Sequence, residues 1–290
     1  WAVSDARHRR EATRRRVRAA MLAPWDDDGA GGLRLVIDCG MDDLMTDGER
    51  RSLTVQIQLG YAAALRAALG PGDEKGDARS RRDGDPDDVE PAAPARILLS
   101  SVAGRFEAAL DRDSGSASWP LRRSRKPFDE AALDAVAPGR GGEADEADDR
   151  AVDVTNDRGG PASPLRPRPR LVFLSPDAPT ALTSAPDRSA VYVIGGLCDY
   201  KRLKRATLDR AERAGIDAAR LPILESLGVD APVNVLTVDQ CVEALAIADR
   251  TRGDWARALR TVLPARKLRE MDRRLEERRG GLGGEERGVT

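Results

Sequence analysis

Short runs of aliphatic and β-branched residues that alternate with helical patterns constrain the fold of this chain more than any other feature. The runs that predict strands, including a shorter fifth one, lie at residues 33–39, 96–101, 171–175, 190–196 and 220–223. The helices expected between and after them, the last of which is highly charged, lie at residues 47–69, 103–110, 203–214, 237–250, 254–262 and 268–279. Strands that alternate with helices predict an α/β domain built on a parallel sheet.

Two long stretches, residues 70–94 and 138–169, cannot contribute to a hydrophobic core. Both are rich in Gly, Pro, Asp and Arg and hold almost no large apolar side chains. Segments of this composition cannot bury enough apolar surface to offset the entropy lost on ordering, so we expect two disordered insertions. The domain itself is expected over residues 33–267, after a basic helix within residues 1–25 and before a charged tail at residues 268–290.

The composition excludes several classes of protein. The longest apolar runs have the length of a strand, so none reaches the roughly 20 residues that cross a bilayer. Cys39, Cys198 and Cys241 are far apart and His8 is the only histidine, which argues against a zinc site, a disulfide scaffold and a hydrolase that uses histidine. The cysteines are expected to be free thiols. A GxGxxG motif after the first strand and a GxxxxGK(S/T) motif are both absent, so neither a dinucleotide-binding fold nor a P-loop is predicted.

Charge is segregated along the chain, although 48 Lys and Arg nearly balance 49 Asp and Glu. The first twenty residues hold seven arginines against two acidic residues and contain neither Gly nor Pro, which predicts a basic helix. Such a helix is a solvated charged helix, part of a transit peptide, or an arm that contacts the phosphates of a nucleic acid. Because residue 1 is Trp, we expect a fragment or a trimmed chain, and nucleus, cytoplasm and an organelle stay open as compartments.

Residues just after the predicted strands are the candidates for chemistry, because ligands of an open parallel sheet bind beyond the carboxyl ends of its strands. Gly195 and Gly196 lack a Cβ and let backbone approach a ligand, and Asp199 supplies a carboxylate able to act as a base. The alternative is an ordinary turn in which Asp199 caps a helix. Four cations follow at a helix N-terminus, where cations are disfavoured, and favour a polyanionic ligand: Lys201, Arg202, Lys204 and Arg205. Three other acidic residues near a helix start are expected to act as caps rather than to bind metal: Asp42, Asp43 and Asp47.

Six blocks of sequence share an order and spacing with a known family. They are VIDCGMDDLMTDGERRSLTVQIQLGY (36–61), LVFLSPDAP (171–179), VYVIGGLCDYKRLK (191–204), AGIDAARLPI (214–223), VNVLTVDQCVEAL (233–245) and GDWARALRTVLPARK (253–267). Together they resemble the tRNA N1-methyltransferases that modify the purine at position 9, the Trm-ten type of the SPOUT superfamily. The resemblance implies a SPOUT α/β fold with a parallel sheet and a deep C-terminal trefoil knot, a rare exception to unknotted topology.

The resemblance also implies S-adenosylmethionine as cofactor, bent within the knot and held mainly by backbone groups. Its expected positions are Leu174, Gly195, Asp199, Tyr200, Lys201, Arg202, Leu203, Thr207, Leu221, Val235, Leu236 and Thr237. Asp199 corresponds to the family's proposed general base. Guanine N1 carries a proton at neutral pH and must lose it before it can accept a methyl group, so a carboxylate within hydrogen-bonding reach is useful. No metal ion is required.

The expected product is N1-methylguanosine at tRNA position 9, with N1-methyladenosine as an additional or alternative product. The segment TVDQC (237–241) resembles adenine-capable members of the family, whereas many guanine-specific members resemble TVNxV. Asp239 would then be a second catalytic residue, which orients the exocyclic amine of adenine and repels guanine O6. The alternative is that Asp239 caps the helix that begins there.

The expected partner is tRNA, recognised by shape and phosphate contacts, with the target base turned outward. The expected contacts are Arg14, Arg15, Arg16, Gln56, Lys204, Arg205, Arg266 and Lys267. Leu59 replaces a basic residue of the family's QQIxRxY segment, which puts one contact in doubt. Trp119 is a candidate for stacking on a base, whereas Trp255 is expected in the core. We expect a monomeric enzyme; the alternative is a scaffold that presents tRNA to a partner protein of a tRNA-processing complex, with methylation weak or lost.

Overall fold

The computed structural model describes residues 2–25, 31–70, 92–112, 115–136, 169–198, 202–228, 231, 233 and 235–282. These residues contain a six-stranded sheet in the order β3-β2-β1-β5-β4-β6, in which every pairing is parallel. The strands are β1 (Arg34–Asp38), β2 (Arg96–Ser100), β3 (Arg122–Arg123), β4 (Leu171–Leu174), β5 (Val191–Gly195) and β6 (Asp217–Ala219). The predicted α/β architecture with a parallel sheet is confirmed.

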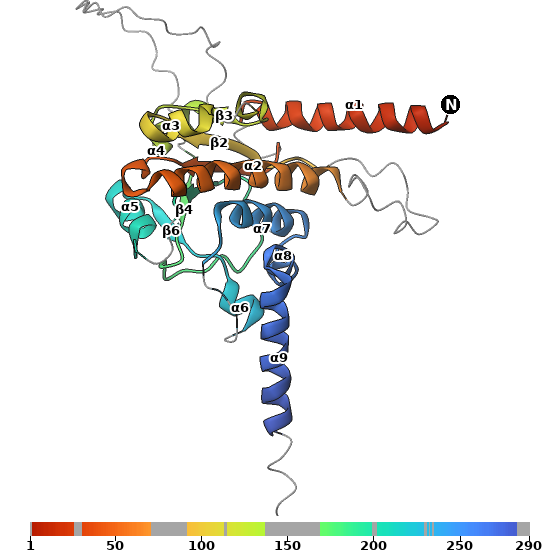
Figure 1. Cartoon of the computed structure of the whole chain (residues 1–290), viewed down its shortest axis with the longest axis vertical. Coiled ribbons are helices and arrows are strands. Elements are labelled where there is room, and N and C mark those ends of the chain that lie inside the picture. Colours follow the sequence, from red (N-terminus) through yellow and green to blue (C-terminus); the bar gives the residue numbers. More distant parts are fainter. Residues whose placement is uncertain are drawn as a thin grey trace, which may run out of the picture.

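Helices surround the sheet and extend beyond it. They are α1 (Ala2–Leu22), α2 (Asp47–Leu69), α3 (Gly104–Asp111), α4 (Phe128–Val136), α5 (Ala206–Ala214), α6 (Ile223–Leu227), α7 (Val238–Arg250), α8 (Trp255–Val262) and α9 (Ala265–Leu282), with 3₁₀ turns η1 (Asp42–Leu44) and η2 (Ser116–Ser118). Figure 1 shows α1 and α9 projecting away from the body that the sheet and the other helices form. No helix among the described residues is both long and apolar enough to cross a membrane.

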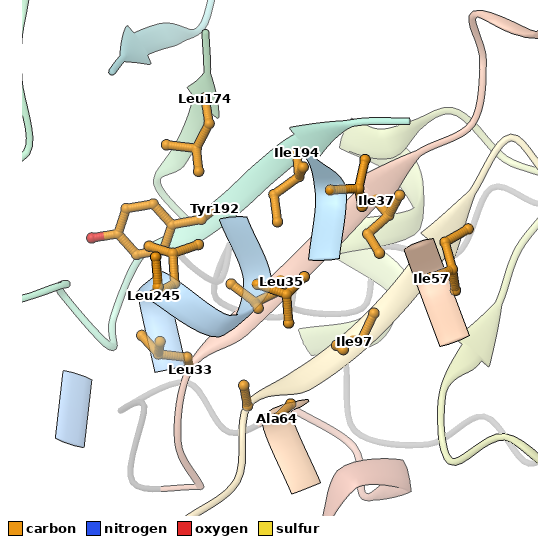
Figure 2. Packing of buried hydrophobic residues seen from close by; sticks show 14 of the residues in the cluster. Leu33, Leu35, Ile37, Ile57, Ala64, Ile97, Leu174, Tyr192, Ile194 and Leu245 are labelled. Atoms are coloured by element: carbon orange, nitrogen blue, oxygen red, sulfur yellow. The ribbon is translucent and has the colours of Figure 1, made fainter. Parts of the chain in front are cut away.

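Each face of the sheet has its own hydrophobic cluster. On one face Leu35 and Ile37 of β1 belong to a cluster that includes Ile57 of α2 and Leu245 of α7, and Figure 2 shows these side chains packed together. On the other face Val36 belongs to a cluster with residues of α4 and α5. Because helices cover both faces, all five residues of β1 are buried, as expected for a central strand of a parallel sheet.

The N-termini of α2 and α7 are both fixed by capping boxes. Thr46 Oγ1 accepts a hydrogen bond from Glu49 N at 3.3 Å, and Glu49 Oε2 accepts one from Thr46 N at 2.6 Å. Thr237 and Gln240 form the equivalent pair at α7. A threonine at the N-cap with Glu or Gln three residues later satisfies two backbone donors of the helix start at once.

Thr46, and not one of the predicted acidic residues Asp42, Asp43 and Asp47, therefore caps α2, and Thr237 rather than Asp239 caps α7. Asp239 lies in the first turn of α7, after its cap Thr237. Asp42 and Asp47 pair instead with the buried Arg50, and Asp42 also accepts a hydrogen bond from Phe106 N in α3 at 3.1 Å. Asp43 is exposed and lies 3.7 Å from a guanidinium nitrogen of α3. These contacts join η1, α2 and α3 at one end of the sheet.

Boundaries differ from the prediction where short elements meet loops. The fifth strand is β6, which ends before residues 220–223, because Leu221 and Pro222 lead into α6. Helix α5 begins at Ala206 rather than at residue 203, since Arg205 has a φ of 59° and cannot continue a right-handed helix. The last helix is α9, which begins three residues before the predicted start of the charged tail. Elements β3, α4 and α6 were not predicted.

The predicted insertions at residues 70–94 and 138–169 lie, except for their ends, outside the described residues. Helix α1 occupies most of residues 1–25. Val17 and Met21 near its end are buried against the body, whereas its arginines Arg14, Arg15 and Arg16 are exposed. The two apolar residues therefore anchor the helix, and its cations face solvent.

Candidate functional site

The carboxyl ends of β1, β5 and β4 stand side by side at one edge of the sheet. Asp38 of β1 pairs with Gly195 of β5, and Ile194 of β5 pairs with Leu174 of β4. Leu174 is buried and Gly195 is half-buried. The structure thus brings two of the predicted cofactor positions to the same edge, as the parallel topology requires.

Gly195 and Gly196 lie where neighbouring atoms leave no room for a side chain. A Cβ on Gly195 would stand 2.5 Å from Thr207 Cγ2 and 3.0 Å from Met41 Cε. A Cβ on Gly196 would stand 2.9 Å from the backbone oxygen of Asp38, the same atom that accepts a hydrogen bond from Gly196 N. The end of β5 is therefore packed tightly between β1 and the first turn of α5.

The loop after β4 holds the start of α5. Thr207 Oγ1 donates a hydrogen bond to Ser175 Oγ at 2.8 Å, and Ser175 is only 2% exposed. Asp177 Oδ2 accepts a hydrogen bond from Arg205 N at 3.0 Å, which stabilises the left-handed conformation of Arg205. Thr207 is a predicted cofactor position. Ser175 and Asp177 belong to a strand end that the sequence also indicates as a place for chemistry, but no individual role was predicted for them.

An ion pair between a buried carboxylate and a partly exposed arginine also holds α5. Arg210 Nε pairs with Asp38 Oδ2, and Arg210 Nη2 lies 3.1 Å from Asp38 Oδ1. The Asp38 side chain has no exposed surface and also accepts a hydrogen bond from Gly40 N at 3.0 Å. Two turns of α5, at Thr207 and Arg210, are thus fixed against the ends of β4 and β1. Sequence reasoning gave Asp38 and Arg210 no role.

Further predicted cofactor positions lie in three segments, which follow β6, precede α5 and precede α7. Leu221 is buried just after β6, and Leu203 is half-buried just before α5. Val235 and Leu236 are half-buried before α7, and Thr237 is exposed at its N-cap.

One stripe of α2 contacts the segment after β5 and the start of α7. Gln56 Oε1 accepts a hydrogen bond from Val238 N at 3.0 Å, and Gln56 Nε2 donates one to Ser52 Oγ at 3.3 Å. Both side chains are also close enough to the thiol of Cys198 to lower its pKa. One turn earlier, Glu49 pairs with Arg202. Gln56, a predicted tRNA contact, is therefore half-buried and bonded within the protein, and its contact with tRNA stays a prediction.

The predicted base Asp199 lies outside the described residues, together with Tyr200 and Lys201. The second predicted catalytic residue, Asp239, is described and half-buried. Its carboxylate is close enough to Cys198 to help raise the pKa of that thiol. Cys198 directly precedes the predicted base Asp199 in the sequence.

The other predicted tRNA contacts lie on several surfaces. Lys204, Arg205 and Arg266 are exposed and Lys267 is half-buried. The Arg205 guanidinium is paired with two carboxylates of α5, at 3.2 Å and 3.1 Å. Among the described residues, no cluster of three or more His, Cys, Asp and Glu side chains is able to hold a metal ion.

Both candidate tryptophans belong to the core. Trp119 is 5% exposed and packs against Tyr61 with ring centroids 5.5 Å apart, so its predicted stacking on a base is wrong. Trp255 is 3% exposed and donates a hydrogen bond from Nε1 to Ser184 O at 2.8 Å, which confirms its predicted place in the core.

The cysteines are free, and burial controls their chemistry. The pKa of the Cys198 thiol is raised to about 11, mainly by burial and to a lesser extent by the charges of Glu49 and Asp239, and the nearby side chains of Ser52 and Gln56 partly offset this rise. Burial also raises the pKa of Cys241 to about 12. Both thiols are therefore protonated at neutral pH, which makes them poor nucleophiles.

We expect the alkylation of Cys198 by iodoacetamide to accelerate up to at least pH 10. Only the thiolate reacts, and at pH 8 roughly one thousandth of a thiol with this pKa is ionised, against about a quarter at the usual pKa near 8.5. Mass spectrometry of the labelled peptide from pH 7 to 10 measures this rate. Protein unfolded in urea is the control, and its rate should level off near pH 9. A rate in folded protein that also levels off near pH 9 would contradict the prediction.

Comparisons with known proteins agree on one family. A sequence model of the family described as tRNA (guanine(9)-N(1))-methyltransferase TRM10/TRM10A matches residues 90–268. A tRNA (guanine(9)-N1)-methyltransferase of Cryptococcus neoformans is 30% identical over 280 residues, which cover 90% of this chain and 63% of that protein. The tRNA methyltransferase 10 homolog A of mouse is 28% identical over 242 residues, which cover 83% of this chain and 56% of that protein. This chain thus spans between about half and two thirds of the length of the relatives it matches.

Two solved structures share the fold. The full-length spTrm10 protein in complex with SAH superposes with a TM-score of 0.55 at 24% identity, covering 84% of this chain and 99% of that chain. The spTrm10(74) structure gives a TM-score of 0.54 at 23% identity, covering 84% of this chain and 97% of that chain. The predicted SPOUT fold is thereby confirmed, whereas the trefoil knot stays a prediction from the resemblance.

Proposed function

Because the chain belongs to the TRM10/TRM10A family of tRNA (guanine(9)-N(1))-methyltransferases, we propose that it transfers a methyl group from S-adenosylmethionine to guanine N1 at tRNA position 9. The observation that carries this proposal is the tightly packed edge formed by Gly195, Gly196 and Thr207, which lies within the matched segment. Relatives from Aspergillus fumigatus and Cryptococcus neoformans are named tRNA (guanine(9)-N1)-methyltransferases, which supports the same reaction.

The residues at this edge fit S-adenosylmethionine. The cofactor has no phosphate, so it needs no glycine-rich phosphate loop, and the chain has none. Leu174 and Leu221 offer apolar side chains for an adenine ring just inside and just after the carboxyl ends of β4 and β6, and the backbone of residues 195–196 beside them is held in place by Asp38, Met41 and Thr207. Leu174, Gly195, Thr207, Leu221 and the backbone of residues 235–237 would hold the cofactor, which when bound supplies an electrophilic methyl group.

Asp199 is the residue to which we assign proton removal. Its carboxylate would accept the N1 proton of guanine, so that the N1 lone pair can form the bond to the methyl carbon while the carbon–sulfur bond breaks. The remaining contribution of the protein is to hold the target base and the methyl group in line. The cations Lys204 and Arg266 and the arginines of α1 would contact tRNA phosphates.

Adenine is the second candidate base, because Asp239 is half-buried and lies close to Cys198, which precedes Asp199 in the sequence. Adenine N1 carries no proton to remove, and a carboxylate could instead accept a hydrogen bond from the exocyclic amine. The competing function is a tRNA scaffold for a processing partner. We further propose a monomeric enzyme of the nucleus or cytoplasm, with an organelle as the alternative, since the arginine-rich α1 suits both RNA binding and import.

Methyl transfer from labelled S-adenosylmethionine to tRNA transcripts with guanine or adenine at position 9 tests the function. We expect the wild-type protein to methylate guanine N1, and Asp199→Asn to lower that rate by about 100-fold, the usual contribution of a general base. Transfer to adenine that Asp239→Asn abolishes would assign Asp239 to base selection. Tight tRNA binding without transfer to either transcript would refute the enzyme and favour the scaffold.

A further inference from the structure

Glu49 connects the N-terminus of α2 with the segment that follows the predicted base. Its Oε2 accepts a hydrogen bond from Thr46 N at 2.6 Å, and both of its carboxylate oxygens lie 3.2 Å from Arg202 Nη2. The same Nη2 donates a hydrogen bond to Leu44 O at 3.0 Å. Arg202 was predicted to bind the cofactor, but its guanidinium is held by η1 and α2.

Two further residues of α2 lie close to Cys198, on the other side of Asp199 in the sequence. Ser52 and Gln56 lie three and seven residues after Glu49, on the same side of the helix, and both side chains are close enough to the thiol of Cys198 to lower its pKa. Cys198 directly precedes Asp199, and Arg202 follows it by three residues. Side chains of α2 therefore lie next to Cys198, before Asp199, and pair with Arg202, after it.

We propose that Glu49 is a positioning residue for methyl transfer, which holds Arg202, three residues after the predicted base Asp199, against α2. This inference rests on the proposed function. A reacting group displaced by about 1 Å can lose about 100-fold in rate, so a contact that restrains its flank affects turnover. Hydrogen bonds from Thr46 and the charge of Arg202 lower the pKa of Glu49, so this carboxylate is ionised at neutral pH.

The same pair contributes little to folding. The side chains of Glu49 and Arg202 are 24% and 53% exposed, and ion pairs with that much solvent contact stabilise proteins only weakly. Glutamine also serves at the third position of a capping box, so Glu49→Gln removes the charge while it keeps the cap of α2. A loss of activity without a loss of stability is therefore the expected signature.

The test compares Glu49→Gln, Arg202→Gln and the double variant with a matched control, Asp217→Asn. The control breaks the Arg170–Asp217 pair, whose nitrogen–oxygen distance of 3.2 Å equals that of the Glu49–Arg202 pair and whose side chains are both exposed. This pair lies at the amino ends of β4 and β6, at the opposite edge of the sheet from the candidate site. The measurements are kcat, KM for tRNA and for S-adenosylmethionine, the melting temperature, and amide hydrogen exchange of peptides that cover residues 196–204.

We expect Glu49→Gln to lower kcat about tenfold, to leave both KM values within about twofold and to leave the melting temperature unchanged. The double variant should lose no more than either single variant, because both remove one contact. Amide exchange over residues 196–204 should rise in these three variants and stay at the wild-type level in Asp217→Asn.

Two results would overturn the inference while the wild type is active: a wild-type kcat in Glu49→Gln, or losses that multiply in the double variant. An equal loss in Asp217→Asn would also overturn it, since a distant surface pair would then act the same way. Failure of the proposed function looks different: the wild type would transfer no methyl group although exchange over residues 196–204 still responds to Glu49→Gln.

Discussion

Replacing Gly195 with valine is expected to lower methyl transfer by about 1,000-fold and to weaken SAH binding strongly. A Cβ at this position would stand 2.5 Å from Thr207 Cγ2, well inside van der Waals contact, and valine adds two methyl groups beyond it. Thr207 cannot rotate away easily, because its side chain is β-branched and its hydroxyl is bonded to the buried Ser175. The first turn of α5 or the end of β5 must therefore move.

The substitution would disturb the site in two ways, by moving one of these elements and by adding atoms beside the expected cofactor. A displacement of about 1 Å costs about 100-fold when it misplaces reacting groups, and added side-chain atoms at Gly195 would also occupy space next to the expected cofactor. Gly195→Ala should give a smaller loss, of about 100-fold, because it adds the Cβ alone. The measurements are kcat/KM with guanine-9 tRNA and the dissociation constant of SAH by calorimetry.

Gly48→Ala is the matched control for this prediction. A Cβ on Gly48 would have its nearest neighbours at 3.9 Å and 4.0 Å, so alanine fits there without strain. Its activity should stay within about twofold of the wild type. Activity of Gly195→Ala close to that of Gly48→Ala would show that the end of β5 can yield, and would remove the close packing of Gly195 from the argument for the cofactor site.

Local signals in the sequence were strong enough to predict most of the fold. The helix Asp47–Leu69 was predicted with both of its boundaries, because a capping threonine precedes it, an apolar stripe runs along it and a glycine ends it. Strand β6 was displaced in the prediction, since Asp217–Ala219 has no large apolar residue and is recognisable as a strand only through its pairing with β4. The short elements β3 and α6 have too few residues to show a period.

The candidate site was predictable only in part, for a different physical reason. Gly195 and Asp199 follow a strand, so their place at the sheet edge can be read from the order of elements. Arg202 looked like a ligand for a polyanion because its partner Glu49 lies 153 residues away in the chain. Asp38 and Arg210 are 172 residues apart, and no local pattern indicates that they meet. Contacts of this kind arise from the topology and not from sequence spacing.

Removing Arg210 from the buried pair with Asp38 is expected to destabilise the protein by about 3 kcal/mol, the largest stability effect that we predict. The Asp38 side chain has no exposed surface, so Arg210→Met would leave a buried carboxylate with only neutral donors, Gly40 N and the Ser101 hydroxyl. Methionine can keep the contact that the Arg210 guanidinium makes over the Phe128 ring, at 5.5 Å from its centroid. The loss therefore reports the charge pair and not the packing.

A double-mutant cycle in urea isolates this pair. Asp38→Asn combined with Arg210→Met should be more stable than Arg210→Met alone by at least about 1.5 kcal/mol, because no unpaired charge is then buried. In thermal unfolding, Arg210→Met should melt roughly 6–12 °C below the wild type. Arg170→Met, which breaks an exposed pair, should change stability by no more than about 0.5 kcal/mol. If Arg210→Met and Arg170→Met unfold at the same urea concentration, the Asp38–Arg210 pair does not hold α5 against the sheet, and the rigid backing that we infer for Thr207 and Gly195 must come from Ser175 and Asp177 in the loop after β4.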